Sequence, residues 1–262
     1  MSKLKNKSGF TLIEVLVVIS VIAVLAGILF PIFAKAKENG LKTTALAQMK
    51  QLGTAFNMYA DQSDDRLLPS TNYGIPEGSP ERLWTNNLMP LVKDQKLFVA
   101  PGSEGEFADT WDKRGAATIG YNSSTAIDKA GGCNDDQADV SACVAFRTVA
   151  QFQKTDPSFM ALFAVTPGGN VADKYLGYEF SPYNGVPVPE NPRLTPPLVS
   201  DRDLVKEMTN YPAELIKPIH ARYLSTGSDD GFTPVVFGDG HVKVYSAKEI
   251  MGNEMKLVWR LR

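Results

Sequence analysis

An apolar run near the N-terminus constrains this chain more than any other feature. From Val15 to Ala34 there are 20 consecutive residues without a charged side chain, and within 10–34 Glu14 is the only charged residue. Twenty residues of α-helix are about 30 Å long, which matches the hydrocarbon core of a bilayer. The run therefore predicts a helix that can span a membrane.

A basic segment precedes the apolar run. Residues 1–9 contain Lys3, Lys5 and Lys7 and no acidic residue. Positive charge beside a spanning helix favours the cytoplasmic face of the membrane. We therefore expect the short N-terminus in the cytoplasm and everything after Lys35 on the other side.

Three interpretations of this N-terminus compete. A secretory signal peptide has an apolar stretch of about 7–15 residues before its cleavage site, and this run is longer, although Ala34-Lys35-Ala36 resembles such a site. A plain signal anchor explains the length but not Glu14. A carboxylate at the centre of a spanning helix costs about 2.5–3.5 kcal/mol on insertion scales, so such a residue is usually placed for a partner.

The third interpretation rests on the sequence around Glu14. Residues 7–14, Lys-Ser-Gly-Phe-Thr-Leu-Ile-Glu, resemble the class III signal of type IV prepilins and type II secretion pseudopilins. The resemblance implies cleavage between Gly9 and Phe10 by a prepilin peptidase on the cytoplasmic face, followed by N-methylation of Phe10. It also implies assembly of the chain into a filament, with Phe10 and Glu14 taking part.

The helix is expected to continue beyond the membrane, because apolar residues recur at steps of three and four up to position 59. The residues on this face are Leu41, Ala45, Met49, Leu52, Phe56 and Tyr59. Pro31 removes a backbone donor inside the helix and predicts a kink. We predict a leader at 1–9, a transmembrane or filament-core helix at 10–34, its amphipathic continuation at 35–60 and a globular domain at 61–262.

The globular domain is expected to be α+β, with the long helix packed on an antiparallel sheet and long loops inserted. Residues 79–93 predict one or two short helices, and 97–100, 118–121 and 159–165 predict strands. Two further strands, at 235–237 and 242–245, flank the tight-turn sequence at 238–240. Six prolines in 180–197 predict a surface loop.

A second resemblance covers most of the chain. The order of FPIFAKAKE, QMKQLGTAFNMYADQSDDRLLPS, TIGYN and VVFGDGHVK is similar to that of large prepilin-like proteins with a processing-associated His-x9-Asp-Gly domain. Ala100-Pro101 departs from the Cys-Pro often found there. Nine residues separate His220 from Asp230-Gly231, which is the spacing in the family's name. The sequence around His241 is nevertheless the better match to the family's final hairpin, so we align that one. This resemblance implies a family and a fold without a mechanism.

Few residues suggest bound metals or bridges. Cys133 and Cys143 lie on the exported side, where oxidising conditions favour a disulfide. Asp229 and Asp230 are the best candidates for calcium, which major pseudopilins resembling this chain often hold. Their spacing does not fit an established calcium loop, and a solvated turn explains the same residues and is the favoured interpretation. No other cofactor is expected.

Catalysis and nucleic-acid binding are not expected. The chain has two histidines and none of the Gly-x-Ser-x-Gly, phosphate-loop or His-Glu-x-x-His patterns, so a site built from His220, or from His241 with Asp239, has no sequence support. Its 27 basic and 29 acidic residues give no overall excess of positive charge that would indicate nucleic-acid binding. We do not expect an enzyme.

The residues therefore favour a structural subunit of an extracytoplasmic filament, either a type IV pilus or a type II secretion pseudopilus. Its expected partners are further copies of itself, the prepilin peptidase and the inner-membrane assembly machinery. It would lie in the inner membrane before it enters a periplasmic or extracellular filament. The alternative is a minor pilin or anchored adhesin that binds a surface or carbohydrate, with Trp84 and Trp111 as candidates for stacking on sugars.

The first prediction concerns the mature N-terminus. Mass spectrometry of membrane or filament material should find a chain that begins with N-methylated Phe10, because the basic leader and Gly9 mark the cleavage site. A chain that begins at Met1 or Ser2, or after Ala36, would contradict the pilin interpretation.

The second prediction is a bridge between Cys133 and Cys143 in exported protein. Closing so short a loop should stabilise the fold by about 2–3 kcal/mol, chiefly by restricting the unfolded chain. Peptide mapping without reductant should recover the two cysteines in one linked pair. Recovery of both as free thiols would contradict the bridge.

Overall fold

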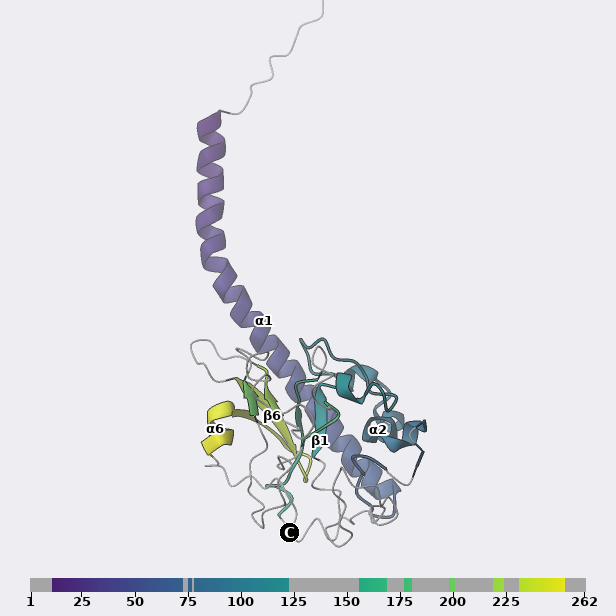
Figure 1. The fold of residues 1–262 in the computed structure, drawn as a ribbon. Helices are drawn as coiled ribbons and strands as arrows, with labels where there is room; N and C mark the ends of the chain where they lie inside the picture. Colours follow the sequence, from purple (N-terminus) through teal and green to yellow (C-terminus); the bar gives the residue numbers. More distant parts are fainter. Residues whose placement is uncertain are drawn as a thin grey trace, which may run out of the picture. The chain divides into compact units, whose positions relative to one another are not determined.

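The structure, a computed structural model, describes residues 11–72, 75–76, 78–122, 156–168, 177–180, 198–200, 219–223 and 231–252. The chain divides into two compact units, Met1–Gly40 and Leu41–Arg262, and we describe each by itself. One helix, α1 (Leu12–Gln62), contains every described residue of the first unit except Thr11 (Figure 1). The same helix forms the beginning of the second unit. Its 51 residues confirm that the helix expected to begin near residue 10 continues without a break to about residue 60.

The amphipathic part of α1 presents the predicted face to the core. Ala45, Met49, Leu52 and Phe56 are buried there, while Leu41 and Tyr59, at the two ends of the same face, are partly buried and pack against the core. The spacing of these residues matches the helical period, so the helix buries one stripe of apolar side chains.

Short helices and strands follow α1. The helical segments are η1 (Pro80–Arg82), α2 (Trp84–Val92), η2 (Gln95–Phe98), η3 (Arg114–Ala116) and α6 (Ala247–Gly252). The strands are β1 (Ile119–Asn122), β2 (Ala161–Val165), β3 (Glu179–Phe180), β4 (Leu198–Ser200), β5 (Ile219–Ala221), β6 (Phe232–Phe237) and β7 (Val242–Ser246).

Five of these strands form one sheet in the order β3-β1-β2-β6-β7. The pairs β1–β2, β2–β6 and β6–β7 are antiparallel, with Tyr121 opposite Phe163 and Val235 opposite Lys243. The edge strand β3 pairs with β1 in parallel, so the sheet is mixed. The other three pairings are antiparallel, and the expected α+β fold, with a long helix packed on such a sheet, is confirmed. Strands β4 and β5 form a separate parallel pair.

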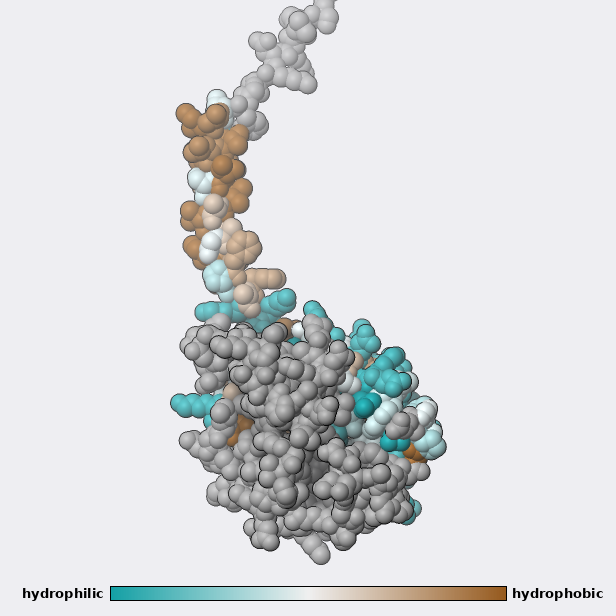
Figure 2. Space-filling model, viewed as in Figure 1, coloured by the Kyte–Doolittle hydropathy of each residue, from teal (hydrophilic) through white to brown (hydrophobic). Residues whose placement is uncertain are grey.

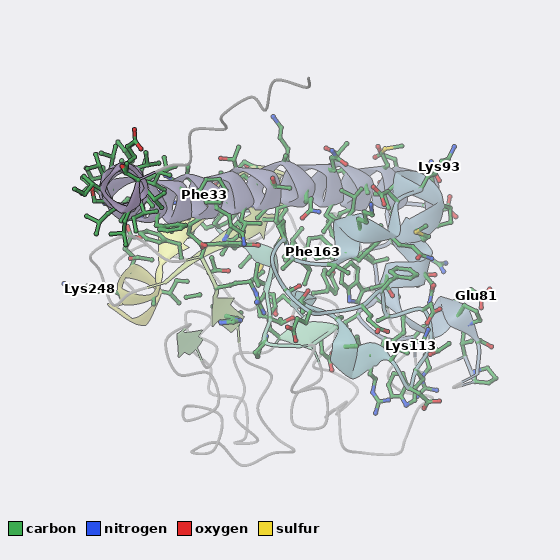
Figure 3. All side chains as sticks on the ribbon, turned by 90° about the horizontal axis from the view of Figure 1, so that it is seen from above. Phe33, Glu81, Lys93, Lys113, Phe163 and Lys248 are labelled. Atoms are coloured by element: carbon green, nitrogen blue, oxygen red, sulfur yellow. The ribbon has the colours of Figure 1, made fainter. Side chains whose placement is uncertain are left out.

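Both faces of the sheet are covered. The second half of α1 lies along one side (Figures 1 and 3), and Met49, Leu52 and Phe56 share a buried cluster with sheet residues such as Phe163 and Val236. A second buried cluster contains Ala161, Ala164, Phe180, Ile219, Val235, Phe237, Tyr245 and Ile250. Neighbouring residues of β6 contribute to different clusters because successive side chains of a strand point to opposite faces.

Aromatic rings fill the space between α1 and the sheet. Phe163 of β2 has its ring centroid 6.1 Å from that of Phe56, 5.1 Å from Trp84 and 5.1 Å from Tyr121. Trp84, fully buried at the start of α2, also donates from Nε1 to the carbonyl of Tyr178 at 2.5 Å. Large, tilted aromatic contacts of this kind supply much of the burial in a core.

The predicted local elements are confirmed with two exceptions. Residues 79–93 form η1 and α2, the strand predictions for 118–121 and 159–165 match β1 and β2, and the 238–240 turn joins β6 to β7. Residues 97–100 are not a strand, because 3-10 helix η2 begins at Gln95, where Asp94 Oδ1 accepts from the Lys96 N–H at 3.0 Å. Phe180, the first residue of the predicted surface loop, is instead buried in β3, and the rest of that loop lies outside the described residues.

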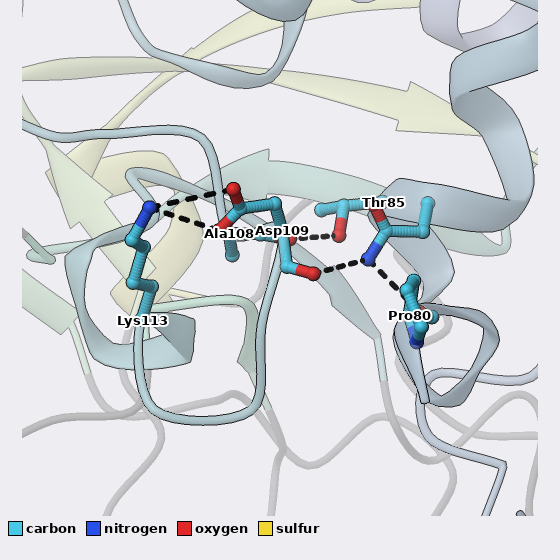
Figure 4. Close-up of polar contacts among 6 residues, drawn as sticks. Pro80, Thr85, Ala108, Asp109 and Lys113 are labelled. Carbon is cyan, nitrogen blue, oxygen red and sulfur yellow. Dashed lines mark hydrogen bonds and ion pairs between the residues drawn. The ribbon is translucent and has the colours of Figure 1, made fainter. Parts of the chain in front are cut away.

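The loop before η3 is tied to the segment that contains η1 and α2 (Figure 4). Asn86 Nδ2 donates to the carbonyls of both Pro80 and Asp109 at 2.9 Å, and the Thr85 hydroxyl donates to the carbonyl of Ala108 at 2.5 Å. Lys113 pairs with the Asp109 carboxylate at 3.1 Å. Side chains thus replace regular secondary structure in holding this loop in place.

Two glycines allow the β6–β7 hairpin to approach α1 closely. A Cβ atom added to Gly53 of α1 would lie 2.9 Å from Val236 Cγ1 and 3.1 Å from the Gly240 carbonyl oxygen. Gly240 itself has φ +85°, a conformation that glycine adopts without strain. The close contact therefore depends on the missing side chain at position 53.

The third prediction is that Gly53→Ala destabilises the domain. Alanine is the better helix former by about 1 kcal/mol, but the added Cβ overpacks a site with no space for it, at a cost of about 1–3 kcal/mol. Urea unfolding of the mature chain in detergent should therefore give a lower free energy of unfolding for Gly53→Ala.

Gly40→Ala is the matched control, because it lies in the same helix and its added Cβ meets nothing within 4 Å. This variant should be as stable as the wild type or more stable, through helix propensity alone. Equal stabilisation by both substitutions would contradict the close contact at Gly53.

Candidate functional site

The first part of α1 exposes a long, predominantly apolar surface. Its most apolar stretch of 18 residues has a mean hydropathy of 3.0, which makes the helix long and apolar enough to cross a membrane. Large apolar side chains from Leu12 to Phe33 are between 50% and 79% exposed, and they cover this part of the helix in Figure 2. Such a surface needs lipid or protein around it.

Glu14 is the charged group at the start of this surface. The Thr11 N–H and the Thr11 hydroxyl both donate to Oε2 of Glu14 at 2.8 Å, and the Glu14 N–H donates back to the Thr11 hydroxyl oxygen at 3.3 Å. The Val15 N–H donates to the Thr11 carbonyl at 3.3 Å. Thr11 is thus the N-cap of α1, and the pair forms a reciprocal capping box.

The role of Thr11 was missed in the sequence analysis. Its signal is present there, because Thr11-Leu12-Ile13-Glu14 has the Thr-x-x-Glu spacing of a capping box before an apolar run. The sequence resemblance drew attention to Glu14 as a charge, whereas the structure shows the same carboxylate as a hydrogen-bond acceptor within its own chain.

Pro31 lies within α1, and the helix continues through it. Proline has no N–H, so the carbonyl of Gly27, four residues earlier, lacks its usual helical partner. The kink expected at Pro31 stays a prediction.

The other predicted site residues lie outside the described part of the chain. These residues are Gly9, Phe10, Cys133, Cys143, Asp229 and Asp230, so the cleavage site, the disulfide and the calcium site stay predictions. Within the described ranges, no group of three or more His, Cys, Asp or Glu residues is placed to hold a metal ion.

The two histidines occupy different environments. His220 is fully buried in β5. His241 follows the β6–β7 turn, where its Nδ1 lies 2.6 Å from Oδ1 of Asp239 and its ring stacks on Phe237 with centroids 4.2 Å apart. The Asp239 carboxylate also accepts from the backbone N–H of His241 at 3.0 Å, so this pair closes the hairpin turn.

The candidate sugar-stacking tryptophans are engaged within the protein. Trp84 is fully buried in the aromatic core. The Trp111 ring lies against two guanidinium groups, with Cζ of Arg82 4.2 Å and Cζ of Arg114 4.1 Å from its centroid. Cation–π contacts of this kind fix Trp111 between two segments of the domain, so neither ring supports the carbohydrate-binding alternative.

Comparison with known proteins adds two findings. Residues 4–30 match the model of the prokaryotic N-terminal methylation motif. Type II secretion system core protein G of Pseudomonas aeruginosa is 30% identical over 116 residues, which are 39% of this chain and 80% of that protein.

Two further relatives carry the same name. The Vibrio cholerae protein is 32% identical over 75 residues, 29% of this chain and 50% of its own. The Escherichia coli protein is 37% identical over 70 residues, 27% of this chain and 47% of its own. The chain thus spans four fifths of the Pseudomonas protein and about half of the other two, and no solved structure matches it.

A methylation motif that leads into a long apolar helix, followed by an α+β domain, defines a pilin-like protein of the pseudopilin class. Within that class, the chain belongs to the family of type II secretion system core protein G.

Proposed function

We propose that this chain is a structural subunit of a type II secretion pseudopilus, assembled through the first part of α1. The observation that carries the proposal is the exposed apolar surface from Leu12 to Phe33, with Glu14 at its start. The methylation motif over residues 4–30 and the secretion-system relatives support the same role.

Such a helix has two environments that can cover it. Before assembly the surrounding lipid covers the apolar side chains, and in a filament the equivalent helices of neighbouring subunits cover them. Lipid tails are as apolar as leucine, so the hydrophobic effect alone does not move a helix from one environment to the other. Packing and polar contacts must therefore favour the filament.

Glu14 can supply such a polar contact. Cleavage after Gly9 would leave a positively charged amine on Phe10, and N-methylation keeps that charge. We propose that Glu14 pairs with the Phe10 amine of a neighbouring subunit in the apolar interior of the filament. A buried charge left without a partner there costs free energy, so the pairing would also fix the stagger between subunits.

The remaining partners follow from this route. The prepilin peptidase would remove residues 1–9 at the cytoplasmic face, and the assembly machinery of the inner membrane would extract the helix from lipid. The domain after α1 would lie outside the cytoplasm, as the three lysines of the leader favour. This assignment makes the chain the substrate of processing rather than an enzyme.

The fourth prediction is that Glu14→Ala enters filaments poorly. Tagged Glu14→Ala subunits produced alongside wild-type subunits should insert into the membrane and lose the leader normally. Their share of the filament should fall at least tenfold below their share of the cleaved membrane pool, because the charge pair is lost. Immunoblotting of sheared filaments and membranes measures both shares.

Ser20→Ala is the matched control in the same apolar segment. The Ser20 hydroxyl donates to the carbonyl of Val17 at 2.8 Å within its own helix, so its removal should leave incorporation unchanged. Entry of Glu14→Ala into filaments at the wild-type level would contradict the proposed pairing.

A further inference from the structure

The capping box uses only one oxygen of the Glu14 carboxylate. Oε2 accepts both hydrogen bonds from Thr11, one from its N–H and one from its hydroxyl. None of the described residues donates a hydrogen bond to the other oxygen, Oε1. The local helix and a partner from another chain can therefore share this carboxylate without competing for one oxygen.

The capping box also restricts where the carboxylate lies. A glutamate at the start of a helix has several rotamers, and an exposed side chain such as Glu14 has no tertiary packing to select one. Two bonds to Oε2 hold the carboxylate against the first turn of α1. In lipid or in a filament interior, where no water replaces these bonds, the restraint is stronger than in water.

We propose that Thr11 is a positioning residue for filament assembly: it holds Oε2 of Glu14 within the chain and leaves Oε1 for the amine of the neighbouring subunit. This inference rests on the proposed function, because it assigns a role within the same contact. Thr11 acts through Glu14, and the Glu14 carboxylate makes the contact with the neighbouring subunit.

The side chain at position 11 therefore needs a hydroxyl. Serine keeps the hydroxyl and caps helices as well as threonine does or better, whereas valine keeps the size and branching of threonine without the oxygen. Loss of an N-cap oxygen typically costs about 1 kcal/mol, which corresponds to about a fivefold change in an equilibrium.

The test measures incorporation of full-length tagged variants into filaments formed with wild-type subunits, normalised to the cleaved membrane pool of each variant. Thr11→Val should enter filaments about fivefold less well than the wild type, and Thr11→Ser should lie within twofold of it. Normalisation to cleaved protein separates assembly from any effect of position 11 on the peptidase. Wild-type incorporation of Thr11→Val, or failure of Thr11→Ser to restore it, would overturn the proposal.

A double-mutant cycle distinguishes positioning from an independent structural role. If Thr11 acts through Glu14, then Thr11→Val should cost much less once Glu14 is alanine, because only the bond from the backbone N–H of residue 14 to the Thr11 hydroxyl is then lost. Additive losses would overturn the positioning role while leaving the proposed function intact. Wild-type incorporation of Glu14→Ala itself would instead contradict the pairing in the proposed function.

Discussion

One helix has to satisfy two different surroundings, and the rest of the structure depends on how α1 does this. Its first part exposes large apolar side chains all around, whereas its second part buries a single stripe that includes Met49, Leu52 and Phe56. A helix that is apolar on every side is suited to lipid or to a helical core, and an amphipathic one to the surface of a domain. The first part of α1 is therefore suited to assembly with other helices, and the second part to folding with its own domain.

The second part of α1 organises the domain around it. The aromatic cluster of Phe56, Trp84, Tyr121 and Phe163 brings together the helix, α2 and two central strands. The β6–β7 hairpin reaches the same helix at Gly53, where a side chain would collide with it. Aromatic packing and the close approach of the hairpin at Gly53 thus both position the domain on α1.

The sequence predicts well those features that depend on local patterns of residues. The step of three and four residues after Leu41 identifies the buried face of α1, and the Asp-Gly turn at 239–240 identifies the hairpin, because both patterns are local. The strand prediction for residues 97–100 is wrong because four apolar residues fit a strand or a short helix equally well. Asp94 caps the 3-10 helix that forms there instead.

Tertiary features were harder to foresee. The parallel pairing of β3, only two residues long, and the contact between Gly53 and the hairpin depend on segments far apart in the chain. In the candidate site, Glu14 was identified from its charge in an apolar run, but its bonds to Thr11 required the structure. The 116 residues aligned with the Pseudomonas protein are only 39% of this chain, so much of the domain has no counterpart in that alignment.

Helical reconstruction of filaments purified from the native source tests the central claim most directly. We expect this chain to be a repeating subunit of the helical lattice, with the first part of α1 in the core and the carboxylate of Glu14 beside the N-terminal amine of the next subunit. A filament that lacks this chain, or one in which the apolar part of α1 lies outside the core, would contradict it.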